Sequence, residues 1–173
     1  MRLSIAGIIV LTLFLFSCKH TKTDMVTGTW KGANFENPDM DDFFKESQHY
    51  IDTLGSSKDA RTNWELYGVT NMDSLKKELQ NQHDSAHAMQ RNAVLKTIFN
   101  FKKDSVAVVS FNGSLDTSKW YLKGDTLVMI EMTGPEQGMN TQMQILALSE
   151  TEMKLKFEMD SSYSTVTFVK QKN

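Results

Sequence analysis

The stretch that decides the fold is Thr27-Gly28-Thr29-Trp30-Lys31-Gly32. β-Forming residues surround one large aromatic side chain, Trp30, and this pattern is typical of a short strand. Strand patterning does not return until Thr97, and it then continues almost to the end of the chain. We therefore expect this first strand to pair with distant ones, with 97–102 on one side and 164–170 on the other, so that the sheet closes.

The composition is that of one ordinary globular domain. The chain has 173 residues, of which 40% are hydrophobic and 23% are charged, and its formal net charge is -2. The leader carries Arg2 as its sole charge, so the remaining chain has 18 basic and 21 acidic residues, a net charge of -3. An acidic balance argues against nucleic acid or an anionic membrane surface as the main partner.

The amino-terminal segment predicts export. Met1-Arg2 and the apolar run from Leu3 to Phe16 match the charged and hydrophobic regions of a secretory signal. A spanning helix needs about 20 apolar residues, and this run ends sooner. We expect residues 1–17 to be a signal peptide that takes no part in the fold.

The cysteine that follows is the expected site of lipid attachment. Leu15-Phe16-Ser17-Cys18 resembles a bacterial lipobox, and Cys18 is the sole cysteine, so no internal disulfide is available to it. Acylated Cys18 would hold the protein on the lipid bilayer. The alternative is an ordinary signal peptide with cleavage near Ser17 and a free thiol.

A polar tether is expected over residues 18–25, because they have no hydrophobic period. It begins with Lys19 and His20, where some surface-exported lipoproteins carry acidic residues. This favours the periplasmic face of the outer membrane, with display at the cell surface as the alternative.

A helical insertion is expected over about 38–94. Asn37 can cap a first helix that begins at Pro38 and ends at Gly55. A second helix is expected over 58–67, with Trp64 as its anchor and Gly68 as its stop.

A third and longer helix is expected to begin at Thr70, whose spacing to Asp73 resembles a capping box, and to reach Ala93. Its apolar residues, which include Met72 and Met89, form one stripe. Because each of the three helices has a single apolar face, we expect the whole block to lie against the sheet.

The strand pattern predicts the fold class. Eight strands are expected, over 27–35, 97–102, 105–111, 119–123, 126–132, 141–148, 152–159 and 164–170. Short connections join the last seven, so neighbours should be antiparallel. Eight is the number that closes into a barrel wide enough for side chains or one small ligand. We predict a mainly β protein with an α insert, built as an eight-stranded up-and-down barrel with two or three helices between strands one and two.

These residues resemble a known family. Gly28-Thr29-Trp30 resembles the Gly-x-Trp motif of lipocalins, and the stretches 120–127 and 148–155 are similar to the lipocalin-like domains of Bacteroidetes lipoproteins. The resemblance covers the strands. The chain lacks a Thr-Asp-Tyr motif, and it offers Lys170 or Lys172 where the family places an arginine over the tryptophan.

The resemblance implies one domain over 26–173 whose barrel holds a small hydrophobic or amphipathic ligand without covalent chemistry. Gly28 and Trp30 would plug the barrel floor. The ligand-cavity candidates are Trp120, Met129, Met143, Met153 and Phe157. The helical insert would be a lid or, alternatively, an outer wall of a solid barrel. The alternative function is that of a structural or protein-interaction lipoprotein without a ligand.

Signals for catalysis and metal binding are weak. His83 and His87 share one helix face, but the glutamate of a zinc-protease motif does not follow His83. A solvated helix face also explains the pair. The chain has no Gly-x-Ser-x-Gly motif and no phosphate-cradling loop. We therefore expect no enzyme, no cofactor and no metal.

Overall fold

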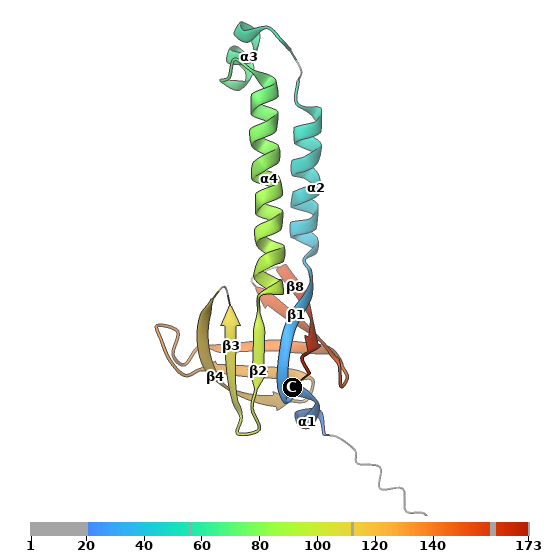
Figure 1. The fold of residues 1–173 in the computed structure, drawn as a ribbon, viewed down its shortest axis with the longest axis vertical. Helices are drawn as coiled ribbons and strands as arrows, with labels where there is room; N and C mark the ends of the chain where they lie inside the picture. The colour runs from blue at the N-terminus through green and yellow to red at the C-terminus, as the bar shows by residue number, and fades with distance from the viewer. Residues whose placement is uncertain (1–20, 56, 112, 160–161, 173) are drawn as a thin grey trace, which may run out of the picture.

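The strands pair in the order in which they occur along the chain, and the last pairs with the first to close a barrel (Figure 1). The computed structural model describes residues 21–55, 57–111, 113–159 and 162–172. Within them the strands are β1 (Gly28–Glu36), β2 (Ile98–Phe101), β3 (Val106–Phe111), β4 (Ser114–Lys123), β5 (Thr126–Glu131), β6 (Asn140–Leu148), β7 (Glu152–Met159) and β8 (Ser162–Lys170). All neighbouring pairs are antiparallel, which confirms the predicted eight-stranded up-and-down barrel.

Strand β1 lies between β2 and β8, as its isolation in the sequence predicts. Trp30 is paired with Phe99 of β2 and with Lys170 of β8. The register of β1 against β8 shifts between Gly32 and Asn34, where the strand carries a bulge.

Strand β4 is longer than the alternation of its side chains predicts. It begins at Ser114, directly after Gly113, which adopts a positive φ of 89° in the turn. Its pairing with β3 begins at the turn, where Ser114 of β4 lies opposite Phe111 of β3, and extends to Lys119 opposite Val106. Because residues 114–116 are exposed, they show no apolar period, and the sequence predicted a start at 119.

The barrel interior is packed with large apolar side chains over most of its depth. Its fully buried members include Trp30, Phe101, Leu127, Met153, Leu155 and Phe168. Phe99 stacks on Phe168 with 4.9 Å between ring centroids, and Phe101 meets Trp120 edge-on at 5.2 Å. This packing is the hydrophobic core that holds the closed sheet together.

A short helix closes the floor of the barrel. Helix α1 (Lys22–Val26) begins with a capping box between Thr21 and Asp24, and Val26 is fully buried in the barrel core. The indole Nε1 of Trp30 donates a hydrogen bond of 2.7 Å to the backbone oxygen of Val26. Residues 22–25 were predicted to be part of a polar tether, but they are helical. The helix is held on the barrel because Val26, at its end, is buried in the core.

The insert contains three helices: α2 (Pro38–Thr53), α3 (Ala60–Tyr67) and α4 (Met72–Leu95). Asn37 caps α2 by accepting from the backbone nitrogen of Met40 at 2.9 Å, as predicted. Gly68 ends α3 in the left-handed conformation, also as predicted. The cap of α4 is Asn71, whose side chain accepts from Ser74 N, and not Thr70. An asparagine at this position caps as well as a threonine.

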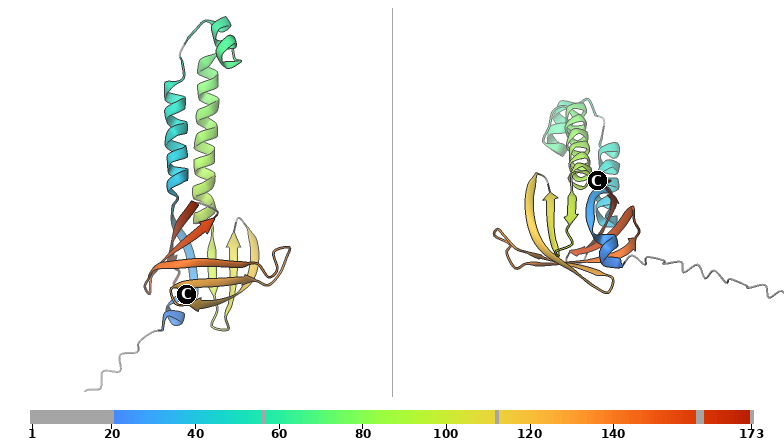
Figure 2. Two further views of the ribbon diagram at one scale, coloured as in Figure 1. Left: turned by 180° about the vertical axis from the view of Figure 1, so that it is seen from behind. Right: turned by 60° about the horizontal axis from the view of Figure 1, so that its bottom comes forward.

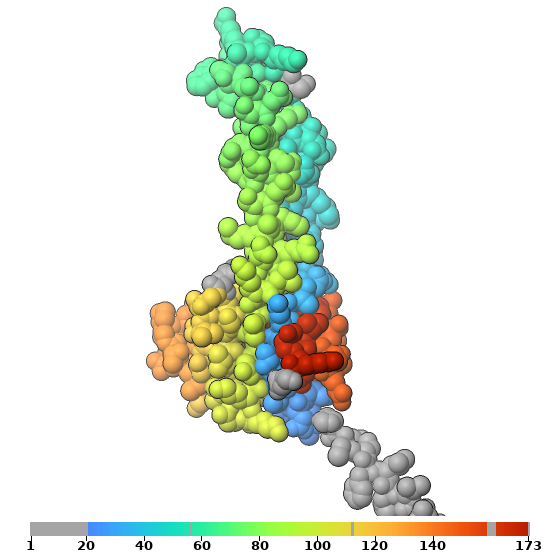
Figure 3. Space-filling model, in the orientation of Figure 1, coloured from blue at the N-terminus to red at the C-terminus, as the bar shows by residue number. Residues whose placement is uncertain are grey.

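The insert is a helical hairpin that stands away from the barrel. Helices α2 and α4 run side by side, and α3 lies at the tip, far from the strands (Figures 1 and 2). The space-filling view shows a narrow stalk on a broader base (Figure 3). The expectation that the helices lie against the sheet, as a lid or a wall, is wrong. One residue separates β1 from α2 and two separate α4 from β2, so the helices continue the direction of adjacent strands.

Side chains from both helices hold the hairpin together. The ring of Phe44 in α2 meets those of His83 and His87 edge-on, at 5.4 and 5.0 Å between centroids. Gln48 and Gln80 exchange hydrogen bonds of 3.0 Å. Trp64 is 63% exposed, so it is not an anchor, and Met89 of the predicted stripe is 73% exposed. A helix that packs on one partner helix covers a narrower stripe than one that packs on a sheet.

The root of the hairpin is packed tightly on β1. A side chain at Gly32 would place its Cβ 2.1 Å from the backbone oxygen of Val94, near the end of α4. Gly32 N donates to Thr97 O at 2.9 Å, beside this contact. The glycine therefore lets helix and strand backbones touch.

The predicted signal peptide, residues 1–17, and Cys18 lie outside the described residues. Among the helices that the structure describes, none is long and apolar enough to cross a membrane.

Candidate functional site

A pocket of about 170 Å³ opens inside the barrel, at the end opposite α1. Its apolar lining is Phe99, Val109, Met129, Met139, Met143 and Phe157. Its polar lining is Asp116, Ser118, Glu131, Glu136 and Thr141. We call this pocket the barrel mouth. The β5–β6 loop, residues 132–139, supplies Glu136 and Met139. This loop therefore borders the mouth, where the helical insert was expected to lie.

The floor of the mouth is apolar because it is the upper surface of the barrel core. Met129 and Met143 are 6% and 1% exposed, and Phe99 belongs to the stacked aromatic group of the core. Alternation along β5 and β6 aims these side chains inward. Methionine side chains adapt to ligands of different shape, which suits a binding surface.

The rim of the mouth carries a partly buried hydrogen-bonded pair. Ser118 and Glu131 lie directly opposite each other on β4 and β5. The Ser118 hydroxyl, in a residue 2% exposed, donates to Glu131 Oε2 at 2.9 Å. Glu131 Oε1 is buried and accepts no hydrogen bond from the described residues. An unsatisfied buried acceptor is costly, so Oε1 is a polar atom of the mouth whose hydrogen-bonding capacity is unmet.

The backbone around this pair is held on both sides. Gly138 N donates to Glu131 O at 2.8 Å, and Glu131 N donates to Met139 O at 2.9 Å. Met132 N donates to Thr117 O at 2.9 Å. These bonds tie the β5–β6 loop to the end of β5, and they fix the carboxylate on a supported backbone.

The predicted cavity residues divide into two groups. Met129, Met143 and Phe157 line the mouth. Trp120 and Met153 lie deeper, where they are 2% and 0% exposed and do not line it. Trp120 Nε1 donates to Lys102 O at 3.1 Å, which satisfies the indole inside the core.

The polar rim was not among the sites expected from the sequence. Ser118 is two residues before Trp120 and Glu131 is two residues after Met129, so both fall at inward-facing positions of the strands. A polar residue that continues an apolar alternation at the end of a strand is a signal for a barrel rim.

The floor residues Gly28 and Trp30 lie at the other end of the barrel. Trp30 is fully buried. Gly28 has a φ of 129°, and a Cβ there would lie 2.6 Å from Lys170 Cε. Glycine at this position admits the Lys170 side chain, which crosses to the tryptophan ring.

The histidine pair serves the hairpin. His83 Nδ1 lies 3.2 Å from Asp84 Oδ1, and its Nε2 lies 3.2 Å from Phe44 O. Hydrogen bonds from Gln80 and then from His83 lower the pKa of Asp84. In the part of the chain that the structure describes, no three His, Cys, Asp or Glu side chains are grouped to hold a metal ion.

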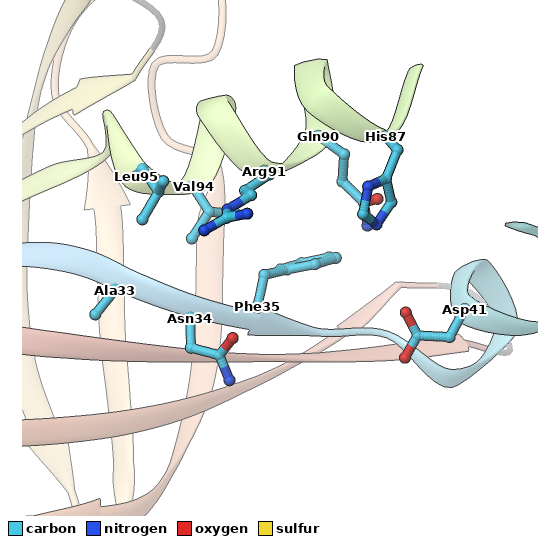
Figure 4. A pocket seen from close by; sticks show the side chains of 9 residues that line it. All are labelled: Ala33, Asn34, Phe35, Asp41, His87, Gln90, Arg91, Val94 and Leu95. Atoms are coloured by element: carbon cyan, nitrogen blue, oxygen red, sulfur yellow. The ribbon is translucent and has the colours of Figure 1, made fainter. Parts of the chain in front are cut away.

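A second cavity, of about 240 Å³, lies where the hairpin meets β1 (Figure 4). Arg91 and Gln90 reach into it from α4, and Phe35 faces them from β1, whereas the Asn34 side chain points away from the helix. Asn34, Asp41 and Arg91 are exposed to solvent. The barrel mouth is the better candidate site, because its buried carboxylate oxygen has no partner among the described residues.

Comparison with known proteins finds a family whose profile matches most of the barrel. The profile of a family described as lipocalin-like matches residues 86–171, which span the end of α4 and strands β2 to β8. No curated protein matches the chain.

Solved structures that are similar to it include two from Bacteroides species. One is a lipocalin-like protein from Bacteroides uniformis, 18% identical, with a TM-score of 0.35, covering 45% of this chain and 81% of that one. The other is a DUF4847 family protein from Bacteroides vulgatus, 12% identical, with a TM-score of 0.45, covering 86% of this chain and 96% of that one. The family match over 86–171 and the closed antiparallel barrel together show that this part of the chain has a lipocalin-like fold.

Proposed function

We propose that this protein is an envelope lipoprotein whose barrel binds a small hydrophobic or amphipathic molecule non-covalently. The observation that carries the proposal is the barrel mouth, a cavity with an apolar floor and a short polar rim. Binding pockets combine apolar walls with a few placed polar groups. An engineered apolar cavity of about 150 Å³ binds benzene, so the volume of this mouth suits a single ring or a short chain.

The proposed anchor would hold the barrel close to the bilayer. Cys18 precedes Lys22, the first residue of α1, by four positions, and an extended chain spans at most about 3.6 Å per residue. Helix α1 closes the barrel floor, so the mouth and the hairpin would face away from the membrane. The periplasmic face of the outer membrane is the proposed location.

Binding can be tested with a neutral apolar probe. Full-length protein in lipid nanodiscs is titrated with benzyl alcohol, and ligand-observed NMR measures binding against empty nanodiscs. We expect saturable binding that Thr141→Trp abolishes, since Thr141 lines the mouth and a tryptophan there fills it. Gln142→Trp is the matched control, because Gln142 is exposed and lies outside the lining. Binding that does not saturate, or that is equal in both variants, contradicts the proposal.

The anchor can be tested separately in cells. Cys18→Ala should stop incorporation of an alkyne-labelled fatty acid and release the protein from the membrane fraction. Retention of the label in Cys18→Ala would show that the lipid is attached elsewhere or that the label is not specific.

A second candidate function rests on the hairpin. Trp64 and Leu66 in α3 are 63% and 69% exposed, and α3 lies at the tip of the stalk (Figure 1). Trp64 and Leu66 are two positions apart on the helix, so they lie on different sides of α3, and each can contact a partner at the tip. We infer that the tip contacts a protein partner in the envelope. A photo-reactive residue in place of Trp64 should give a discrete cross-linked product that Leu66→Asp removes; a product unchanged by Leu66→Asp contradicts it.

A further inference from the structure

We propose that the ligand of the barrel mouth is a small amphipathic amine, whose ammonium group pairs with Glu131 while its apolar part lies on the floor. This inference rests on the proposed binding function and narrows it to one chemical class. Four features of the mouth lead to it: an unpaired carboxylate oxygen, the charge of the rim, the nature of the floor and the volume.

The unpaired oxygen defines what the ligand must donate. Ser118 donates to Glu131 Oε2 at 2.9 Å and so holds the carboxylate in one orientation. Glu131 Oε1 is then left buried without a partner among the described residues. A carboxylate accepts hydrogen bonds and donates none, so the missing group is a donor. An ammonium group carries three donors and a positive charge.

The charge of the rim decides between a charged and a neutral donor. Asp116, Glu131 and Glu136 line the mouth, and no Lys, Arg or His among the described residues lines it. Three carboxylates with no cationic side chain among the described lining residues create a negative potential that attracts cations into the cavity. A hydrogen bond to a charged partner is about twice as strong as a neutral one. The same potential repels carboxylates, so a fatty acid is disfavoured.

The apolar floor of the mouth suits the hydrocarbon part of an amphipathic amine. Phe99 and Phe157 line the mouth beneath the rim, together with Met129 and Met143. Aromatic faces attract cations as well as apolar groups. At about 170 Å³ the mouth holds one ring or a short alkyl chain, so long-chain amines would extend into solvent.

The test compares three probes that share one ring and differ in charge. Full-length protein in lipid nanodiscs is titrated at neutral pH with benzylamine, benzyl alcohol and benzoate by calorimetry, with empty nanodiscs as the blank. Benzylamine is protonated under these conditions, as aliphatic amines are. We expect benzylamine to bind about tenfold more tightly than benzyl alcohol. Benzoate should bind more weakly than either. Added salt should weaken benzylamine alone.

Variants of the rim identify the group responsible. Glu131→Gln keeps the shape and should remove most of the preference for benzylamine over benzyl alcohol, while the affinity for the alcohol changes less than about twofold. Glu152→Gln removes the same charge from an exposed residue at the start of β7, and it should change neither affinity. Should Glu131→Gln fail to fold, Glu136→Gln in the exposed β5–β6 loop should still weaken benzylamine and remove part of its salt dependence.

The outcomes separate this inference from the function on which it rests. Benzyl alcohol that binds as tightly as benzylamine, or benzylamine that is unaffected by Glu131→Gln, overturns the amine while binding in the mouth stands. Failure of all three probes to bind, with no difference between Thr141→Trp and the wild type, overturns both.

Discussion

Lys170 Nζ lies 4.9 Å from the centroid of the Trp30 ring and donates a hydrogen bond of 2.8 Å to the backbone oxygen of Met25. A lysine thus occupies the place over the tryptophan where the family resemblance implies an arginine. It joins α1, β1 and β8 at the barrel floor. The contact combines a cation–π interaction with a charge-assisted hydrogen bond.

The Lys170 contact predicts a pH dependence at high pH. Burial lowers the pKa of Lys170, and the charge of Glu150 opposes this in part. Between the lowered folded value and the ordinary value of 10.5, the unfolded chain binds more protons than the folded chain. The free energy of unfolding of the wild type should therefore rise with pH in this window, relative to Lys170→Met. At neutral pH both states are protonated, and the difference should be flat.

Urea unfolding of both proteins from neutral pH to about pH 10 measures this difference. Other titrating groups cancel in the comparison. A difference that falls as the pH rises would show that the pKa of Lys170 is raised and not lowered in the folded protein.

Trp30→Ala should remove about 3–5 kcal/mol from the free energy of unfolding, because it empties the barrel floor. Trp30 is fully buried and its indole bonds to Val26 O at 2.7 Å, so both a cavity and an unpaired carbonyl result. Trp64→Ala is the matched control, since Trp64 is 63% exposed. It should change stability by less than about 0.5 kcal/mol. Equal losses in the two variants would place Trp64 in a packed environment.

Gly32→Ala should cost about 1–3 kcal/mol, because its Cβ would lie 2.1 Å from Val94 O and helix and strand backbones would have to separate. Gly55→Ala is the control. Its Cβ would meet the end of the Tyr67 side chain at 3.2 Å, which can move aside. Thermal unfolding compares the two. A Gly55 variant that loses as much as the Gly32 variant would contradict this account of the hairpin root.

Phe44→Ala should loosen the hairpin without unfolding the barrel. Phe44 packs on His83 and His87, whereas its neighbour Phe43 is 62% exposed. Amide hydrogen exchange should quicken along α2 and α4 and stay unchanged in β2 to β8, since regions of a protein open with different free energies. Phe43→Ala should leave both patterns as in the wild type. Exchange that quickens in the strands as well would mean that hairpin and barrel unfold together.

Local sequence patterns were sufficient to predict the helices and strands and the order of the strands in the sheet. Alternation identified the strands, and the isolated Trp30 strand had to pair with distant partners to satisfy its backbone. Asn37 and Gly68 marked helix ends because capping depends on a few neighbouring residues. Such features follow from the backbone period and from short-range hydrogen bonds.

The direction of the hairpin and the character of the mouth depended on the tertiary structure. An apolar helix face predicts that the helix packs on a partner, but it does not predict whether that partner is a sheet or another helix. Trp64 therefore matched an anchor and yet lies exposed. Ser118 and Glu131 are 13 residues apart in sequence, and register alone brings their side chains together. The buried oxygen that Glu131 leaves unpaired exists because β4 and β5 pair at this position in a closed barrel.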